Sequence, residues 1–448
     1  MEKRDVVIIG GGPAGRVVVH ALHAAGAGLC VTLIKDEEVN VNRCAVPYGI
    51  PDEKPLEKYQ IPNTLVTDFG AELVIDRVTA IDSAARRVIT AGGREFQYGD
   101  LVLATGSRPL IPPLPGVDSP LITPVRSLAD LSRLRRLAAA GRRAVVVGGG
   151  YIGIEVAVVL REMGIEVTLV EMLPKILLAT TEPEFIGLIE DKLTQHGIRL
   201  LTGRGVTSFA QRSDRDIEVQ LNGGETLGAD FVVMSVGVTL NTELAAEAGL
   251  KTSRLGIWTD DHLRTSAPHI YACGDCAQKR SFVTGQPCRG EFGTNAVFMA
   301  RVVAHNILGK REKFPGVINA NATTVFDIGL GQAGLTEQMA SDAGIAMITG
   351  TSQVLDKYPM MPGVAPIHTK LVFNAATRRL IGGCVLRRGF GAAQCADFIS
   401  FAIQKQATVD DLLLLQYATH PEQAAKPSDN AFVFAARQAA SEMQRRRD

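Results

Sequence analysis

The sequence has no net charge, no long hydrophobic run and no even set of cysteines. Lysine plus arginine and aspartate plus glutamate each number 47, so we expect neither nucleic acid nor an anionic membrane as a partner. We expect no membrane span, because no run of about 18 or more apolar residues is present. The start is charged and unlike a signal peptide, and the seven cysteines are scattered. These absences argue against a disulfide framework and predict a cytoplasmic protein.

Two similar stretches stand out in what the sequence does contain. Residues 5–36 are DVVIIGGGPAGRVVVHALHAAGAGLCVTLIKD, and residues 143–172 are RAVVVGGGYIGIEVAVVLREMGIEVTLVEM. Each has the pattern of a β-branched strand, a glycine turn, a helix and a second β-branched strand, which is a βαβ unit. The chain has 448 residues, so there is room for both units to head separate domains. We therefore predict two Rossmann-like dinucleotide-binding domains.

The segments between and after these units indicate how the chain divides. Residues 100–118 run from an apolar strand into a proline-rich connection, which is typical of a chain that leaves one domain for another. Near residue 320 the pattern changes to that of an antiparallel sheet with helices. The predicted fold is α/β, with an additional C-terminal α+β domain. The predicted domains are residues 1–118 with 261–320, residues 119–260, and residues 321–448.

Both βαβ units carry the pattern G-x-G-x-x-G. Its members are Gly10, Gly12 and Gly15 in the first unit, and Gly148, Gly150 and Gly153 in the second. Glycines at this spacing allow a tight turn and let backbone N–H groups approach a pyrophosphate at a helix N-terminus. A single pattern is a weak signal, but two that each follow a strand and open a helix indicate two nucleotide sites.

The last residue of the second strand in each unit distinguishes the nucleotides. Glu171 ends that strand in the second unit, where a carboxylate accepts hydrogen bonds from a ribose and repels a 2′-phosphate. We therefore expect NADH there rather than NADPH. The first unit has Lys35 at this point, and a lysine cannot accept such hydrogen bonds. We predict that the neighbouring Asp36 takes the role; the alternative is that the ribose is held in another way.

The two glycine patterns, LVLATGSRP, IYACGDC and a C-terminal GLTE resemble, in this order, the FAD-dependent pyridine nucleotide–disulfide oxidoreductase family. The resemblance covers nearly the whole chain. It implies that the first glycine pattern binds FAD, that the second binds NAD(P)H, and that the C-terminal domain forms the interface of a homodimer. The residues it places around the two nucleotides are Gly10, Gly12, Pro13, Ala14, Gly15, Asp36, Arg43, Thr105, Gly106, Asp275, Gly148, Gly150, Tyr151, Ile152, Gly153, Glu155, Glu171 and Gly237.

Three of these residues receive specific roles from the resemblance. Asp275 is implied to hydrogen-bond the ribityl chain of the flavin. Tyr151 is implied to gate the nicotinamide pocket, and Glu155 is implied to lie near the N5 edge of the flavin. The alternatives are packing at a helix start for Tyr151 and a solvated helix face for Glu155.

The stretch NRCAVPYGI contains a single cysteine, Cys44. The position five residues later is Gly49, so a C-x4-C dithiol is excluded. The pattern resembles the single-cysteine branch of the family, which includes coenzyme A-disulfide reductases, NADH oxidases and peroxidases, and persulfide reductases. Beside Arg43, a flavin and a helix N-terminus, the thiol is expected to have a lowered pKa and to act as a nucleophile. The alternative is a packed, inert thiol.

Proline at position 13 bears on the choice among these activities. Oxidases and peroxidases of the branch carry a histidine just after the second glycine, which serves as an acid–base group. Pro13 has no proton to give, and this argues against a peroxidase or an oxidase.

The segment 412–430 holds two further candidates. Tyr417 resembles a tyrosine that, in coenzyme A-disulfide reductases, reaches the cysteine of the partner subunit. His420-Pro421 resembles the His-Pro of the dithiol branch, although Ala425 stands where that branch has its orienting glutamate. We predict that Tyr417 and His420 act as proton donors across the dimer; the alternative for His420 is a loop histidine. Met360-Met361 replaces an expected tyrosine pair, which argues against coenzyme A as the substrate.

The sequence thus predicts a cytoplasmic homodimeric flavoenzyme in which NADH reduces FAD and FAD reduces Cys44. Cys44 would be oxidised at rest as a mixed disulfide, persulfide or sulfenic acid, and its thiolate would attack a small disulfide, persulfide or polysulfide. The alternatives are an NADH oxidase, a reductase of a small electron-carrier protein and a nucleotide-sensing module. We expect no metal, because Cys273 and Cys276 have C-x-x-C spacing without a second ligand pair.

Overall fold

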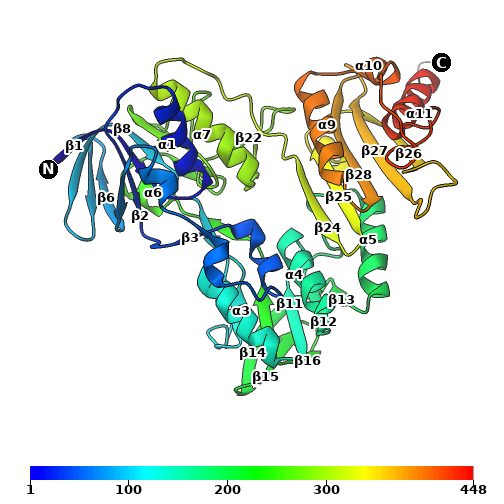
Figure 1. The fold of residues 1–448 in the computed structure, drawn as a ribbon, viewed down its shortest axis with the longest axis horizontal. Coiled ribbons are helices and arrows are strands. Elements are labelled where there is room, and N and C mark those ends of the chain that lie inside the picture. Colours follow the sequence, from blue (N-terminus) through cyan, green and yellow to red (C-terminus); the bar gives the residue numbers. More distant parts are fainter. Residues whose placement is uncertain (447–448) are drawn as a thin grey trace.

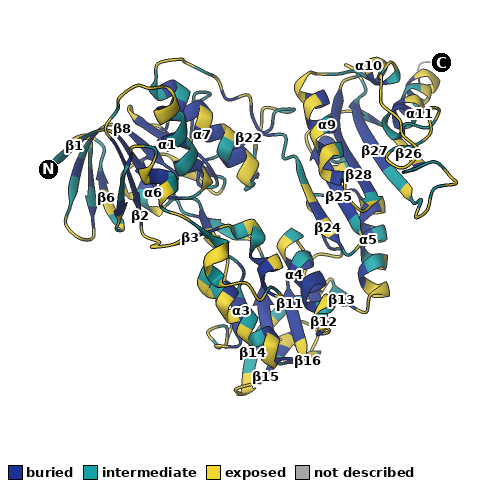
Figure 2. Cartoon of the chain, in the orientation of Figure 1, coloured by how far each residue is buried: buried dark blue, intermediate teal, exposed yellow. Residues whose placement is uncertain are grey.

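The computed structural model describes residues 1–446, which form three main sheets with helices packed on them (Figure 1). Figure 2 shows that the central strands of the sheets are buried, while the outward helix faces and many connecting loops are exposed. Within residues 1–446, no helix is both long and apolar enough to cross a bilayer. The predicted C-terminal range 321–448 ends two residues beyond the described chain.

The first sheet is a parallel sheet extended by an antiparallel hairpin. Its order is β5-β2-β1-β8-β7-β6, and β21 pairs in parallel with the C-terminal end of β8, on the edge opposite β1. Its strands are β1 (Glu2–Ile9), β2 (Val31–Lys35), β5 (Glu72–Ile75), β6 (Val78–Asp82), β7 (Arg87–Thr90), β8 (Glu95–Leu103) and β21 (Ile270–Ala272). Every residue of β2 is buried, as expected for a parallel strand covered on both faces. The helices α1 (Pro13–Ala24) and α7 (Gly293–Ile307) pack against each other beside this sheet.

The second sheet is wholly parallel, with the order β10-β17-β11-β12-β13. Its strands are β10 (Ile122–Pro124), β11 (Arg143–Val147), β12 (Glu166–Glu171), β13 (Arg199–Thr202) and β17 (Phe231–Met234). Its helices are α3 (Leu128–Ala140), α4 (Tyr151–Glu162) and α5 (Pro183–Gln195). A separate three-stranded antiparallel sheet consists of β14 (Val206–Ser213), β15 (Asp216–Leu221) and β16 (Thr226–Ala229).

The third sheet is antiparallel, with the order β24-β25-β28-β27-β26. Its strands are β24 (Asn321–Val325), β25 (Ile328–Gly334), β26 (Met347–Leu355), β27 (Pro366–Asn374) and β28 (Leu380–Arg388). The accompanying helices are α8 (Glu337–Asp342), α9 (Ala392–Gln404), α10 (Val409–Leu413) and α11 (Ala431–Arg445). The predicted fold class is confirmed, with two Rossmann-like β-α-β units and a C-terminal α+β region.

The chain passes between the first two sheets at a paired crossing. β9 (Ser107–Pro109) pairs with β18 (Val238–Leu240), and the Thr105 hydroxyl donates to the Asn241 carbonyl oxygen at 2.7 Å. The core of the first sheet also includes Ala245, Leu250 and Ile257. Residues before 261, the predicted start of this part of the domain, thus already pack in the core of the first sheet. We propose a boundary near residue 241.

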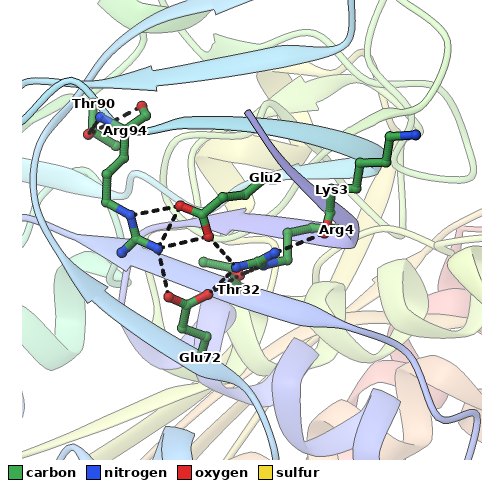
Figure 3. Close-up of polar contacts among 7 residues, drawn as sticks. All are labelled: Glu2, Lys3, Arg4, Thr32, Glu72, Thr90 and Arg94. Atoms are coloured by element: carbon green, nitrogen blue, oxygen red, sulfur yellow. Dashed lines mark hydrogen bonds and ion pairs between the residues drawn. The ribbon is translucent and has the colours of Figure 1, made fainter.

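A charged cluster ties the N-terminal ends of the parallel strands together, far from the glycine loops (Figure 3). Arg94 donates to Glu2 at 2.9 Å and to Glu72 at 2.8 Å, and Arg4 donates to Glu72 at 2.6 Å. Burial works against ionisation of Glu72, but the hydrogen bonds from Arg94, Arg4 and Thr32 lower its pKa to about 2. The cluster therefore keeps its charges at every physiological pH and stabilises the sheet away from the functional site.

Candidate active site

The first glycine of each pattern turns the chain against a neighbouring strand. Gly10 has φ +112°, and a Cβ there would lie 2.1 Å from the Ala104 carbonyl oxygen. Gly148 has φ +107°, and its Cβ would lie 2.5 Å from the Ser235 carbonyl oxygen. Both positions combine a left-handed conformation with a backbone contact, so only glycine fits.

In both patterns the third glycine is crowded by backbone atoms, whereas the second glycine faces open space. A Cβ on Gly15 would lie 2.0 Å from the Gly10 carbonyl oxygen, and one on Gly153 would lie 1.9 Å from that of Gly148. These glycines let each helix pack closely on its turn. Gly12 and Gly150, the N-cap residues of α1 and α4, have no atom within 4 Å of an added Cβ and cap their helices with no side chain. Each therefore leaves open space at a helix N-terminus, which is what a pyrophosphate requires.

Three arginines gather around the first of these openings. Arg126, between β10 and α3, has a buried Nη2 without a hydrogen-bond partner in residues 1–446, and burial together with Arg43 lowers its pKa to about 10. Burial and Arg43 also lower the pKa of Arg16 on α1. Guanidinium groups that lower the pKa values of their neighbours by charge repulsion favour an anion between them. The residues present therefore fit the diphosphate of FAD. The sequence analysis missed Arg126 and Arg16, since neither belongs to a recognisable motif.

Lys35 and Glu171 hold equivalent places in the two units. The residues before them, Ile34 and Val170, accept hydrogen bonds at 2.8 Å from the first glycine of each pattern. Glu171 Oε2 accepts from the Gly149 N–H at 2.6 Å, so its carboxylate lies against the glycine loop. Lys35 Nζ instead donates to Asn63 Oδ1 at 2.7 Å.

The structure also describes the other residues that are predicted to bind the nucleotides. Pro13 and Asp36 are exposed, Ala14 is buried, and Gly106 and Gly237 have positive φ values of 67° and 106°. Asp275 follows β21, and its Oδ2 accepts from the Ser107 hydroxyl at 2.7 Å. These residues keep their predicted roles as proposals.

The segment that carries Cys44 leaves the first sheet and packs on the second unit. It follows β3 (Asn40–Val41) and forms two 3-10 turns, η1 (Arg43–Ala45) and η2 (Pro47–Gly49). Val46 is fully buried in the core that holds α4, and η2 contacts α4 directly (Figure 1). Cys44 is a free thiol with an exposed side chain. It therefore lies where the first unit meets α4. The expected helix N-terminus is absent at this place, because Cys44 is the middle residue of the 3-10 turn η1.

The groups of the chain itself act against the expected lowering of the Cys44 pKa. Although the side chain reaches solvent, the surrounding protein disfavours the thiolate and raises the pKa of Cys44. The Glu155 and Asp275 carboxylates raise it further, and Arg43 opposes them. The influence of Arg43 is the smallest of these, and Arg43 also pairs with Glu37 at 3.4 Å.

Glu155 faces this segment from α4. Its Oε1 accepts from the Thr323 hydroxyl of β24 at 2.9 Å, and burial raises its pKa. Tyr48 of η2 interacts with the same carboxylate, and burial together with Glu155 raises the pKa of the phenol. The sequence analysis quoted Tyr48 as part of a motif but gave it no role.

Tyr151 begins α4 and reaches the C-terminal sheet. Its hydroxyl lies 3.2 Å from the Thr180 hydroxyl and accepts a hydrogen bond from Gln332 of β25. The ring also meets Phe292 edge-on, with centroids 6.4 Å apart. Ile152, the next residue, is exposed. The Tyr151 hydroxyl is therefore held by hydrogen bonds, and a gating motion of the ring would have to break them.

Tyr417 and His420 lie in the exposed loop between α10 and α11. The Tyr417 hydroxyl donates to the Pro427 carbonyl oxygen at 2.7 Å, and His420 Nδ1 accepts from the Glu422 N–H at 3.3 Å. In residues 1–446, no hydrogen bond or ion pair joins this loop to the Cys44 segment. One chain thus brings Cys44 to Glu155 and Asp275, but does not bring Tyr417 or His420 to Cys44.

Cys273 and Cys276 are fully buried free thiols, and burial raises both pKa values. Cys276 Sγ lies 3.4 Å from the Leu103 and Cys273 carbonyl oxygens. In residues 1–446, no group of three or more potential ligands is placed to hold a metal ion.

The chain matches the family model "Pyridine nucleotide-disulphide oxidoreductase" over residues 4–300 and the dimerisation domain of that family over residues 320–431. The chain belongs to this family. An NADH oxidase of Methanocaldococcus jannaschii is 30% identical over 428 residues, which are 93% of this chain and 94% of that protein. An NAD(P)H sulfur oxidoreductase (CoA-dependent) of Pyrococcus abyssi is 31% identical over 389 residues, 85% of this chain and 86% of that one.

A similar solved structure is the NAD-dependent persulfide reductase from A. fulgidus. It has a TM-score of 0.90 and 30% identity, and the match covers 98% of this chain and 84% of that one. The present oxidoreductase is thus an FAD-dependent enzyme, as the resemblance implied, and it uses NADH, as Glu171 predicted.

Proposed function

We propose that this oxidoreductase uses NADH to reduce a small disulfide, persulfide or polysulfide at Cys44. The observation that carries the proposal is the position of Cys44. It is a free, exposed thiol without a second cysteine in its segment, held between the first nucleotide unit and α4. A lone thiol in this position can form a mixed disulfide with a substrate but cannot form a C-x4-C disulfide.

The bound FAD supplies a group that accepts hydride from NADH and passes two electrons to a sulfur atom. The chain's own residues do the rest. Gly12, Gly150 and Arg126 bind and orient the nucleotides, and Asp275 holds the ribityl chain. Cys44 supplies the nucleophilic sulfur.

The sulfur substrate agrees with the named activities of two of the similar proteins. One is named an NAD(P)H sulfur oxidoreductase (CoA-dependent) and another an NAD-dependent persulfide reductase. The second candidate function is an NADH oxidase, which is the name of the M. jannaschii relative. Pro13 argues against it, because the residue at the start of α1 offers no proton to reduced oxygen.

The assay that decides between them is anaerobic. We expect NADH-dependent release of sulfide from polysulfide without oxygen, at a rate well above that of aerobic NADH oxidation without a sulfur acceptor. A faster aerobic rate without sulfur would make oxygen the acceptor. If neither acceptor supports turnover, a small electron-carrier protein becomes the acceptor to test.

We also propose that the active enzyme is a homodimer in which Tyr417 and His420 of the partner subunit approach Cys44. Both residues lie on an exposed loop of the region that matches the family's dimerisation domain. Within residues 1–446 neither residue forms a hydrogen bond or ion pair with the Cys44 segment of its own chain, so the proposal places them at the Cys44 of the partner subunit.

Mixed dimers test this arrangement. Cys44→Ser and His420→Ala should each be impaired as homodimers, because each lacks one half of every active site. A mixture refolded or co-expressed to give mixed dimers should regain up to a quarter of wild-type sulfide release, since half of the dimers are mixed and have one intact site. A mixture no more active than the average of its two parents would place His420 outside the site of the partner subunit.

A further inference from the structure

The loop that joins β12 to α5, residues 172–182, packs against the second glycine pattern. The Leu177 N–H donates to the Gly149 carbonyl oxygen at 3.0 Å, and a Cβ on Gly149 would lie 2.7 Å from Ile176. Leu177 has φ +52°, a conformation that a leucine keeps only where its surroundings hold it. Glu171, directly before the loop, accepts from the Gly149 N–H at 2.6 Å. The positions of Gly149 and of the Glu171 carboxylate therefore depend on this β12–α5 loop.

The later part of the β12–α5 loop is bound by the C-terminal sheet. Gln332 of β25 is 6% exposed, and its Nε2 donates to the Thr180 carbonyl oxygen at 2.9 Å. The same amide group donates to the Tyr151 hydroxyl at the start of α4. The Thr180 N–H in turn donates to the Leu177 carbonyl oxygen at 2.9 Å. Hydrogen bonds thus connect Gln332 through Thr180 and Leu177 to the second glycine pattern.

Lys370 of β27 binds the last residue of the β12–α5 loop. Its side chain is 5% exposed, and its Nζ pairs with three carboxylates, those of Glu182 at 3.0 Å, Glu184 at 2.7 Å and Glu337 at 3.2 Å. The side chains of Glu184 and Glu337 are 48% and 40% exposed, whereas that of Glu182 is 3% exposed. Glu182 Oε1 also accepts from the Glu337 N–H at 2.8 Å. In residues 1–446, Lys370 is the one cation that pairs with this buried carboxylate.

The same two parts of the chain also meet at the far end of α5, which runs beside the C-terminal sheet (Figure 1). Lys192 of α5 pairs with Asp327, between β24 and β25, and the His196 ring stacks on Phe326 with centroids 3.9 Å apart. These contacts join α5 to the C-terminal sheet without touching the β12–α5 loop. They provide a comparison for the contacts of Lys370.

We propose that Lys370 is a positioning residue for NADH, with Gln332 as a second tie. The C-terminal domain holds the β12–α5 loop, and the loop holds Gly149 and Glu171 where the nucleotide needs them. This inference rests on the proposed function in one respect, since it places NADH at the second glycine pattern. It goes further by making the C-terminal domain a part of the NADH site.

Methionine in place of Lys370 keeps the length of the side chain but leaves the Glu182 carboxylate buried without a cation. Burial of an unpaired charge is strongly unfavourable, so Glu182 should turn toward solvent and take the end of the β12–α5 loop with it. Leu177 and Gly149 would then move as well, because hydrogen bonds join them to this loop. The first glycine pattern has no such link to Lys370, so FAD binding should not change.

The test measures NADH and FAD separately on the FAD-loaded enzyme. Anaerobic stopped-flow absorbance gives the NADH concentration for half-maximal FAD reduction and the limiting rate of that reduction. We expect Lys370→Met to raise this concentration about 10-fold, with a normal FAD content and a limiting rate within about 2-fold of wild type. Gln332→Met removes the second tie without leaving a buried charge, so it should raise the concentration about 3-fold. It decides the question if Lys370→Met does not fold.

Lys192→Met is the matched control, because it breaks an ion pair between the same two parts of the chain at the far end of α5. It should leave the half-saturating NADH concentration unchanged. The double variant Glu182→Gln/Lys370→Met tests the cause. A neutral amide needs no cation and still accepts from the Glu337 N–H, so the double variant should regain most of the affinity for NADH that Lys370→Met loses.

Three results would overturn the positioning role. They are an unchanged or lower NADH concentration in Lys370→Met or Gln332→Met, an equal rise in Lys192→Met, and a double variant as weak as Lys370→Met. None of these measurements needs a sulfur substrate. Absence of sulfide release by the wild type would therefore overturn the proposed function, and the NADH concentrations would still decide on Lys370.

Discussion

Replacing Cys44 with serine abolishes sulfur reduction and leaves FAD binding and FAD reduction by NADH intact. The side chain is exposed, and the packing of its segment depends on its neighbours Val46 and Pro47, which are buried. A hydroxyl in place of the thiol therefore costs the fold little. It cannot form a mixed disulfide, so sulfide release from polysulfide should fall by about 1,000-fold or more.

An anaerobic titration with NADH, followed by visible absorbance, separates storage of electrons at Cys44 from reduction of FAD. If Cys44 is oxidised at rest, the wild type takes up one more NADH per active site than Cys44→Ser before the flavin absorbance is bleached. Cys30→Ser is the matched control, because Cys30 is also an exposed free thiol. It should behave as the wild type does in both measurements.

The two outcomes have different meanings. Equal NADH uptake by wild type and Cys44→Ser, combined with retained sulfide release, would remove Cys44 from the reaction. The oxygen-reducing and protein-partner alternatives would then lead. Equal uptake with lost sulfide release would mean that Cys44 is a thiol at rest and acts only as the nucleophile.

The fold could be predicted from the sequence because its signals are local. The strands around Val145 and Leu33 are continuous β-branched or aliphatic runs, and a glycine turn with an apolar helix joins each pair. Periodicity and turn chemistry determine such units without reference to the rest of the chain. The boundary that we propose near residue 241 has no such local signal, because Ala245 and Leu250 join the first core through tertiary packing.

The chemical environment of Cys44 could not be predicted in the same way. Its neighbour in sequence is Arg43, which lowers the thiol pKa, but Glu155 and Asp275 arrive from distant segments and raise it. The sign of the shift depends on how far the fold buries the thiol, which is the largest cause, and on which charges it brings together. Arg126 was missed for the same reason, since only the structure reveals that its Nη2 is buried without a hydrogen-bond partner in residues 1–446.

Valine at position 12 or at position 150 should empty one nucleotide site at a time. Gly12 has φ −67° and Gly150 has φ −80°, both conformations that any residue adopts, and an added Cβ at either place meets no atom within 4 Å. The apo fold should therefore tolerate both substitutions. The valine methyl groups would instead occupy the space that the pyrophosphate needs, and overpacking of about 1–3 kcal/mol lowers affinity roughly 5- to 150-fold.

The two variants should differ in colour and in response to NADH. Gly12→Val should be folded but depleted of FAD, whereas Gly150→Val should keep FAD and bind NADH weakly, as measured by flavin absorbance and by the NADH concentration for half-maximal reduction. Gly187→Ala in α5 is the control, because its added Cβ also meets no atom within 4 Å and it lies outside both patterns. A yellow Gly12→Val and a colourless Gly150→Val would exchange the two nucleotide assignments. If both variants keep FAD and respond normally to NADH, the pyrophosphates do not lie at these helix starts. The group of arginines around Arg126 would then bind an anion other than the FAD diphosphate.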